Sequence, residues 1–270
     1  MPKENPKFQP QRDAFVIVPT ISAGRGFEEA IRSWLANQPL EVLIITVEGL
    51  QQSILDLVAQ TLDSGPSTTI TTTDIRVLTI PRASKRQQLA CGIQAAKGSI
   101  LVLVDDDVFW PPTLLPLVLA CFECPRIGGV GTRQRGKIES RSVWEHLAAR
   151  RLAKRNRDVA AMAYLNGSMR CLSGRTAVYR AEILQSKAFI DGFLNVYWMG
   201  RYLLDSGDDK FLTRYLLRHN WLLTVQTHLD AEVTTVLETS PVSLVQVLRW
   251  SRNAWRSYLR AVFLTPQLWG

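Results

Sequence analysis

The chain has 270 residues, of which 46% are hydrophobic and 21% charged, and this balance is typical of a globular protein with a sizeable core. Its formal net charge of +8 favours an anionic partner, whether a nucleotide diphosphate, an acidic lipid surface or a nucleic acid. No run reaches the roughly 20 apolar residues of a membrane-spanning helix. The polar residues 1–12 lack the apolar core of a signal peptide, so we expect a flexible lead-in there.

The first hundred residues alternate between two patterns. Short β-branched or apolar runs predict strands, and apolar residues three to four positions apart predict helices between them. In chain order we expect a strand at 15–18, a helix carrying Phe27, Ala30, Ile31, Trp34 and Leu35, a strand at 42–47, a helix carrying Ile54, Leu55, Val58 and Leu62, a loop at 64–74, a strand at 75–80, a helix capped by Ser84 and followed by Gly98, and a strand at 100–104.

The second half is less regular, and strongly basic in one part. Residues 133–157 carry nine Lys or Arg against two acids. A nucleic-acid arm is one interpretation. We favour a solvated or membrane-facing helix and expect no nucleic-acid partner, because no recognisable nucleic-acid module is present. We expect a strand at 127–132, a helix at 140–163, a strand at 170–179, a helix at 208–219, and a last helix that begins at Ser240-Pro241.

The four cysteines are too few for a disulfide framework in a chain of this length. Cys121 and Cys124 form a single C-x-x-C pair in an apolar stretch. This favours reduced core thiols over a metal or redox site, and a reducing cytosolic setting.

Strands that alternate with helices predict an α/β fold with a largely parallel sheet covered on both faces. The run at 100–104 is the most uniformly apolar and should be central. Such sheets bind ligands at the carboxyl ends of their strands. Pro19-Thr20, Glu48, residues 81–86 and residues 105–107 all follow predicted strand ends, so we expect them around one crevice.

Three adjacent carboxylates, Asp105, Asp106 and Asp107, follow the predicted central strand. Adjacent carboxylates repel one another, so the cluster needs a cation or open water. Oxygen ligands at alternate positions suit Mg²⁺ or Mn²⁺, and such an ion would neutralise a departing diphosphate. A solvated acidic turn is the alternative interpretation.

Lys85 and Arg86 begin a predicted helix, where free N–H groups and the helix dipole attract phosphate. A solvated basic turn is the alternative. Glu48 ends the second strand and could accept hydrogen bonds from a base or a ribose, although a plain loop carboxylate explains it equally well.

Asp208 and Asp209 occupy the first turn of another predicted helix. We expect the helix dipole to lower their pKa values and keep them ionised. An ionised carboxylate can take the proton of an attacking sugar hydroxyl. Repulsion between neighbours should split the two titrations, so that one residue is the base and the other orients it. A simple helix-capping pair is the alternative.

Gln246, Arg249 and Trp250 are spaced i, i+3 and i+4, so they share one face of the last helix. Arginine offers paired donors to phosphate, and tryptophan a flat surface to a sugar ring. Downstream arginines continue a basic stripe opposite apolar residues, so this amphipathic helix also suits a membrane surface. A surface helix with solvated arginines is the alternative.

Four ordered motifs resemble the family 2 glycosyltransferases, specifically the hyaluronan, chitin and cellulose synthase branch. The similarity is closest to hyaluronan synthases and fungal capsule-type polysaccharide synthases, and it covers about residues 15–258. The motifs are Asp105-Asp106-Asp107, Cys171-Leu-Ser-Gly174 with Tyr179-Arg180, Gly207-Asp-Asp-Lys-Phe-Leu-Thr-Arg214, and Gln246-Val-Leu-Arg-Trp250.

The resemblance implies a GT-A fold, which is a Rossmann-like, mostly parallel sheet flanked by helices, with the amphipathic helix at the C-terminal end. It implies that Asp209 is the base and that Asp105 and Asp107 hold Mg²⁺ or Mn²⁺. For the nucleotide sugar it implies contacts from Glu48, Lys85, Asp105, Gln246, Arg249 and Trp250, to which the strand-end and helix-start positions above add Pro19, Thr20 and Arg86. For the acceptor it implies Cys171, Ser173, Gly174 and Trp250.

The sequence departs from the family in two places. Glu48 stands where the family usually has Asp, and no membrane helices follow Gln246–Trp250. We expect a lead-in at 1–12, one GT-A domain at 13–264 and a truncated tail at 265–270. Within the domain, about 13–135 would bind the nucleotide and 136–264 the acceptor. The chain would then be an excised or truncated member of a family that works at the cytosolic face of a membrane.

The function that these observations predict is inverting, metal-dependent transfer of a sugar from a UDP-sugar to the end of a β-linked polysaccharide. A membrane surface, or the transmembrane segments of longer members, would be a further partner. Two alternatives remain open: a non-processive transferase that adds a single sugar to a lipid or saccharide, and a catalytically silent, truncated nucleotide-binding domain.

Overall fold

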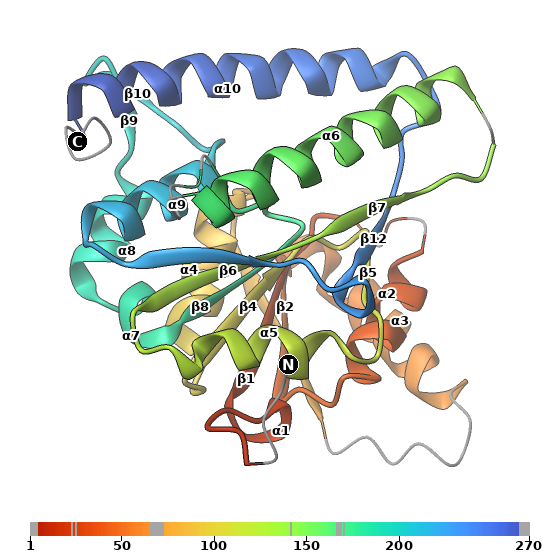
Figure 1. Ribbon diagram of the computed structural model, residues 1–270. Coiled ribbons are helices and arrows are strands. Elements are labelled where there is room, and N and C mark those ends of the chain that lie inside the picture. Colours follow the sequence, from red (N-terminus) through yellow and green to blue (C-terminus); the bar gives the residue numbers. More distant parts are fainter. Residues whose placement is uncertain are drawn as a thin grey trace.

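A seven-stranded sheet forms the centre of the computed structural model, which describes residues 5–22, 24, 26–64, 73–140, 142–165, 169 and 171–264 (Figure 1). The strands of this sheet are β1 (Ala14–Pro19), β2 (Glu41–Val47), β3 (Asp74–Ile80), β4 (Ile100–Val104), β6 (Ile127–Thr132), β8 (Thr176–Arg180) and β11 (Leu222–Gln226). Their order across the sheet is β11-β6-β8-β4-β1-β2-β3, which confirms the central place predicted for β4. Only β8 runs antiparallel to its neighbours, β4 and β6.

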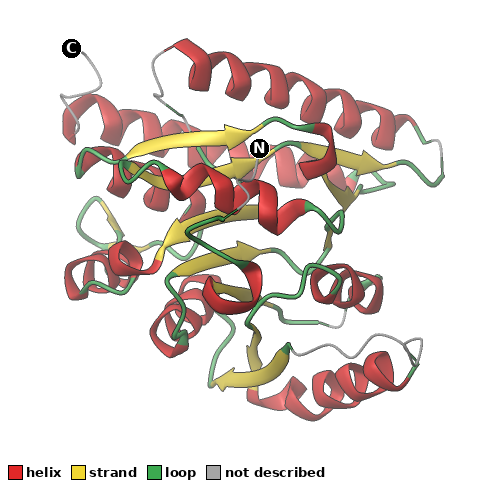
Figure 2. Ribbon diagram, turned by 60° about the horizontal axis from the view of Figure 1, so that its bottom comes forward, coloured by secondary structure: helices red, strands yellow, loops and turns green. Residues whose placement is uncertain are grey.

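Helices cover both faces of this sheet (Figure 2). The helices are α1 (Pro10–Asp13), α2 (Phe27–Leu35), α3 (Gln51–Asp63), α4 (Lys85–Ala95), α5 (Leu114–Leu119), α6 (Val143–Leu165), α7 (Ala181–Leu184), α8 (Lys187–Leu194), α9 (Asp208–Arg218) and α10 (Val242–Leu264). The apolar cluster on one face joins the sheet to α2, α3 and α5, and the cluster on the other face joins it to α4, α8 and α9. The predicted α/β architecture is therefore correct.

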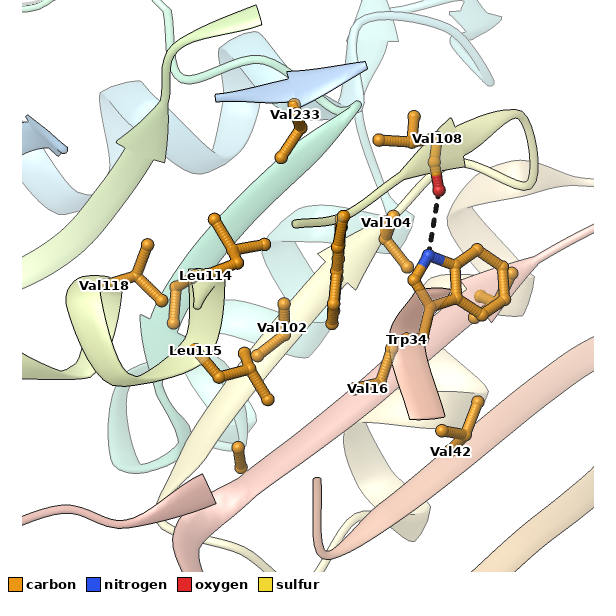
Figure 3. Close-up of a cluster of buried hydrophobic side chains, with 14 of the residues drawn as sticks. Val16, Trp34, Val42, Val102, Val104, Val108, Leu114, Leu115, Val118 and Val233 are labelled. Carbon is orange, nitrogen blue, oxygen red and sulfur yellow. Dashed lines mark hydrogen bonds between the residues drawn. The ribbon is translucent and has the colours of Figure 1, made fainter. Parts of the chain in front are cut away.

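Trp34 shows how the core positions the acidic motif. Its side chain is fully buried between α2 and the sheet, where it packs on the ring of Trp110. Its indole N–H donates to the carbonyl of Val108 at 2.9 Å (Figure 3). Since Val108 directly follows Asp107, this buried bond fixes the backbone at the end of the motif.

Two smaller sheets were not predicted. One joins β5 (Val108–Phe109), β12 (Val233–Val236) and β7 (Gln134–Lys137), with β12 in the middle. The other is the hairpin of β9 (Tyr197–Trp198) and β10 (Tyr202–Leu203). Strands this short have no readable period, so only the folded chain reveals them.

Two predicted details are wrong. On α3, Leu55 and Leu62 are 40% and 47% exposed, and Thr61 is buried in their place. Helix α3 packs against α2 and β3 through Ile54 and Val58, so its buried stripe is narrower than its apolar pattern. The strand predicted at 170–179 begins at Thr176, because residues 171–174 form a loop at the site below. Residues 65–72 of the predicted loop, Arg170 and the tail 265–270 lie outside the described residues.

The basic helix α6 starts in a capping box. The hydroxyl of Ser142 accepts the N–H of Glu145, and the carboxylate of Glu145 accepts the N–H of Ser142, at 3.2 Å each. The same buried carboxylate also accepts the backbone N–H groups of Glu139 and Ser140. These bonds, led by the one from Glu139, lower the pKa of Glu145 to about 2.

Replacing Glu145 by glutamine should therefore remove a pH-dependent part of the stability. The folded pKa of about 2 lies below the value of about 4.3 expected in the unfolded chain. The carboxylate thus stabilises the fold above about pH 4.3, and this contribution is lost as the pH falls towards 2. We expect a lower Tm for the variant at pH 7 and a shallower fall of Tm between pH 5 and 3. Equal slopes in both proteins would contradict this role.

The last helix, α10, lies across the top of the molecule next to α6 (Figure 1). Leu244, Leu248 and Trp255 on this helix are exposed, as are several other apolar side chains. Within the part of the chain that the structure describes, no helix is both long and apolar enough to span a bilayer.

Candidate active site

The parallel strands β1, β2 and β4 bring their carboxyl ends to one edge of the sheet, as predicted. Pro19 ends β1, Thr20 follows it, and both are buried there. Glu48 follows β2, but its side chain is exposed and forms no hydrogen bond or ion pair with another described residue. The structure therefore brings Thr20 into the site and leaves Glu48 at its margin.

Lys85 joins the two acidic motifs. It begins α4, and its ammonium lies 2.5 Å from the carboxylate of Asp105 and 3.7 Å from that of Asp208. Burial alone would lower the pKa of Lys85, but the neighbouring carboxylates, Asp105 foremost, raise it above its usual value. Lys85 is therefore a fixed cation between the end of β4 and the start of α9.

Each of the other two motif carboxylates meets a threonine. The hydroxyl of Thr20 donates to Asp106 at 2.6 Å, and that of Thr235 donates to Asp107 at 3.3 Å. Burial, with the charge of Asp105 second, raises the pKa of Asp107 to about 6. Burial first, opposed by the bond from Thr20, also raises the pKa of Asp106. Burial thus disfavours the charged forms of both carboxylates more than the neighbouring Lys85 and Arg175 favour them.

Helix α9 presents the second pair of carboxylates. Gly207 precedes it with a φ of +81°, a conformation that glycine adopts without strain. Asp209 is partly buried, and its carboxylate accepts the N–H of Lys210 at 2.8 Å. Burial, and after it the charge of Asp208, raises the pKa of Asp209. The sequence predicted a lowered pKa, which is wrong for Asp209 because desolvation outweighs the helix dipole.

The loop at 171–174 packs against α9. The thiol of Cys171 donates to the carbonyl of Leu172 at 3.2 Å and lies beside Asp209, and the hydroxyl of Thr213 accepts the N–H of Leu172 at 2.9 Å. A Cβ atom on Gly174 would lie 3.5 Å from the ammonium of Lys85 and 3.8 Å from Asp105. The two predicted groups, 171–174 and 208–209, therefore lie together at one site, where Ser173 is also buried.

These residues enclose a small cavity with about 10 Å³ of internal space, roughly what one water molecule needs. Its polar lining comes from Lys85, Asp105, Asp208 and Asp209, and Pro19 and Gly174 also border it. The cavity thus has carboxylates of both motifs around one ammonium.

Arg86 has a different place from the one predicted. It is buried, and its guanidinium donates to the carbonyls of Phe193 at 2.9 Å and Ser206 at 3.3 Å. The rings of Phe193 and Phe211 lie against it, at 4.9 and 5.6 Å. In this structure Arg86 supports the loop before α9 and is not an open phosphate ligand.

The motif at 246–250 reaches the site through Trp250. The guanidinium carbons of Arg151 and Arg175 lie 5.2 and 5.9 Å from the centroid of its ring. The charge of Arg175 in turn acts on Asp107. The side chains of Gln246 and Arg249 form no hydrogen bond or ion pair with another described residue, and Arg249 is exposed.

Sequence reasoning missed Arg175, and also Thr235, which holds Asp107. Arg175 directly follows Ser173-Gly174 in the sequence, and this position next to a predicted site motif could have identified it. Thr235 lies on the short strand β12, far along the chain, and no local sequence pattern predicts its contact with Asp107. Its role depends on the pairing of β12 with β5, next to the acidic motif.

The acidic motif fits a divalent cation. Asp105 and Asp107 offer carboxylate oxygens, and a bound cation would offset the burial and the repulsion from Asp105 that raise the pKa of Asp107. Among the described residues, no group of three His, Cys, Asp or Glu side chains could hold a metal by itself. A site with one or two carboxylates suits an ion that takes its remaining ligands from phosphate and water.

Two solved structures have a similar fold. One is the mannosyltransferase PcManGT from Pyrobaculum calidifontis in complex with GDP-Man and Mn²⁺, with a TM-score of 0.63 and 18% identity over 97% of this chain and 66% of that one. The other is glucosyl-3-phosphoglycerate synthase from Mycobacterium tuberculosis in complex with Mn²⁺, UDP and phosphoglyceric acid, with a TM-score of 0.55 and 16% identity over 92% and 78%. This similarity shows the GT-A fold.

Curated relatives show the family. A type 2 glycosyltransferase of Zymoseptoria tritici is 41% identical over 268 residues, which cover 98% of this chain and 55% of that protein. The NDP-glycosyltransferase ltbB of Aspergillus luteorubrus is 35% identical over 277 residues, at 97% and 64% coverage. The chain therefore spans about half to two thirds of these relatives. Residues 10–253 match the family model described as "Glycosyltransferase like family 2". The chain belongs to glycosyltransferase family 2.

Proposed function

We propose that this chain transfers a sugar from a UDP-sugar to a hydroxyl at the end of a β-linked polysaccharide, with inversion at the anomeric carbon. One observation carries the proposal: Lys85 lies between Asp105 at the end of the central strand and Asp208 at the start of α9. A donor bound at the strand ends would therefore lie next to a carboxylate able to act as base.

Asp209 is the base in this proposal. Its pKa is raised by burial, which brings it closer to working pH and makes it a better proton acceptor while still ionised. The N–H of Lys210 donates to its carboxylate and holds its orientation, and the thiol of Cys171 beside it opposes the rise in its pKa. Asp209 would take the proton of the acceptor hydroxyl as that oxygen attacks, and the bond to the diphosphate would break in the same step.

The donor side would use Asp105, Asp107 and Lys85. When bound, Mg²⁺ or Mn²⁺ would supply charge neutralisation for the departing diphosphate. Asp105 and Asp107 would hold the ion, and Lys85 at the start of α4 would add a cation next to the phosphates. The hydroxyls of Thr20 and Thr235 hold the carboxylates of Asp106 and Asp107 in place.

The remaining predicted residues complete this proposal. Trp250 would lie against the acceptor sugar, and the loop at 171–174 would form the acceptor side. Gln246 and Arg249 would contact the diphosphate, which requires a movement of their free side chains. Polysaccharide as the acceptor rests on the similarity to the synthase branch, and a single-sugar transferase would use the same donor site.

Titration of UDP by calorimetry, with and without Mn²⁺, tests the donor site. We expect metal-dependent binding, and we expect Asp107→Asn to lose most of the gain that Mn²⁺ gives. Asp63→Asn on α3, outside the site, makes the same chemical change and is the control. Equal UDP affinity with and without metal, or undiminished metal coupling in Asp107→Asn, would contradict the metal site. A folded protein that binds no UDP would favour the silent domain.

A further inference from the structure

Three arginines gather around Trp250 and the loop at 171–174. Arg151 and Arg155 are four residues apart on α6 and so share one face of that helix. Arg175 follows the loop, and its guanidinium, like that of Arg151, faces the indole ring. We call Arg151, Arg155 and Arg175 the arginine cluster.

Asp107 and Asp209 act on the arginine cluster through their charge, but no carboxylate of the described residues forms an ion pair with it. Among the residues that the structure describes, none of the three forms an ion pair, whereas Lys154 on the same helix pairs with Asp158 at 2.7 Å. Arg155 reaches only the carbonyl of Cys171 at 3.4 Å, which is a long contact. Like charges four residues apart repel, so this arrangement costs stability unless an anion joins it.

A buried donor next to the cluster also lacks an acceptor. The amide oxygen of Gln134 accepts from Arg175 at 3.3 Å, and the whole side chain is 1% exposed. Its amide nitrogen has no hydrogen-bond partner in the described structure. Buried donors are nearly always paired. Three guanidinium groups and an orphaned amide thus point to a missing acceptor of hydrogen bonds.

The cluster lies on the acceptor side of the site. Burial, and after it the charge of Arg175, lowers the pKa of Arg155, while Cys171 and Asp209 counteract this. Arg155 is therefore close to the proposed base and to the loop that packs on α9. Lys85 lies at the strand ends and is not part of the arginine cluster, because its ammonium pairs with Asp105 and Asp208.

We propose that Arg151, Arg155 and Arg175 bind an oxyanion carried by the acceptor, either a phosphoryl group or a carboxylate, close to the hydroxyl that reacts. The inference rests on the proposed function, since it names the acceptor class for that site. Guanidinium forks bind both kinds of oxyanion through paired, charge-assisted hydrogen bonds. The ring of Trp250 keeps two of the guanidinium groups in place.

The test is calorimetry on the full chain, with saturating UDP and Mn²⁺ and again without UDP. Glucose 6-phosphate and gluconate are the anionic probes, and glucose is the uncharged one. We expect at least one anion to bind about tenfold or more tightly than glucose in the presence of UDP, and the tighter of the two to identify the source of the oxyanion. Equal affinity for all three probes would overturn the inference.

Variants locate the binding. Arg155→Gln and the more exposed Arg151→Gln should each weaken anion binding by about tenfold or more, with unchanged UDP affinity. Arg150→Gln removes the same charge from the neighbouring, exposed position of α6 and should have no effect. Arg151→Gln keeps the test valid if Arg155→Gln fails to fold. Anion binding that survives both cluster variants would also overturn the inference.

Competition separates this inference from the proposed function. If glucose 6-phosphate displaces UDP, the arginine cluster serves the donor diphosphate, and the acceptor assignment is wrong while the donor site stands. If UDP does not bind but the anions do, and the cluster variants abolish that binding, the oxyanion site stands and the nucleotide-dependent function fails.

Discussion

Replacing Asp209 by asparagine is expected to lower kcat for sugar transfer by about 10²–10⁴-fold, the usual contribution of a positioned base. Asparagine has the same shape but cannot accept the proton of the acceptor hydroxyl at the moment of attack. The affinity for UDP should change little, because Lys85 bridges Asp105 and Asp208 and not Asp209. The substitution thus separates the chemical step from donor binding.

The rate is measured as UDP release from the UDP-sugar that the unmodified chain uses, and the affinity by calorimetry. Asp191→Asn makes the same chemical change at an exposed position of α8 and should leave both unchanged. A parallel fall of kcat and of UDP affinity in Asp209→Asn would assign Asp209 to donor binding and leave the base unidentified.

The sequence predicted the sheet well because its central strands β1, β2 and β4 are buried on both faces. The run Ile100–Val104 is uniformly apolar, and β4 is fully buried at the centre of the sheet. Since parallel strands end at the same edge, the clusters after β1, β3 and β4 had to meet there. The meeting of Thr20, Lys85 and Asp105 at one edge followed from topology alone.

The surroundings of Arg86 and Trp250 were harder to predict. Arg86 looked like a phosphate ligand because it follows Lys85 at the start of a helix, but α8 and the loop before α9 close over it. Arg175 and Trp250 meet although 75 positions separate them in the chain. Local spacing assigns residues to a helix face or a strand end, whereas such contacts depend on how distant elements pack.

The charges of the site form two groups: carboxylates outnumber cations around Lys85, and cations outnumber carboxylates around Trp250. Around Lys85, the carboxylates of Asp105, Asp208 and Asp209 share a single ammonium, and burial raises the pKa of nearby Asp107 to about 6. Around Trp250, the arginine cluster has no ion pair among the described residues. A cation at the first group and an anion at the second would balance both. This is what a metal–diphosphate donor and an oxyanion-bearing acceptor would supply.

Replacing Arg86 by methionine is expected to lower the free energy of unfolding by about 2–4 kcal/mol. Methionine fills part of the space between Phe193 and Phe211 but donates no hydrogen bond. The carbonyls of Phe193 and Ser206 would lose their buried partner, and such unsatisfied groups cost about 1–3 kcal/mol each. The same change should lower kcat, because the carbonyl of Ser206 immediately precedes Gly207 and the carboxylates of α9.

Urea unfolding at pH 7 measures the stability, and UDP calorimetry at a temperature where the variant is folded measures the donor site. Arg82→Met removes the same charge from an exposed position three residues before Lys85 and should cost less than about 0.5 kcal/mol. Arg86→Lys keeps the charge but not the planar fork, so we expect an intermediate loss of stability. If Arg86→Met is as stable as Arg82→Met but no longer binds UDP, Arg86 is a phosphate ligand after all, and α8 must move away from it when the donor binds.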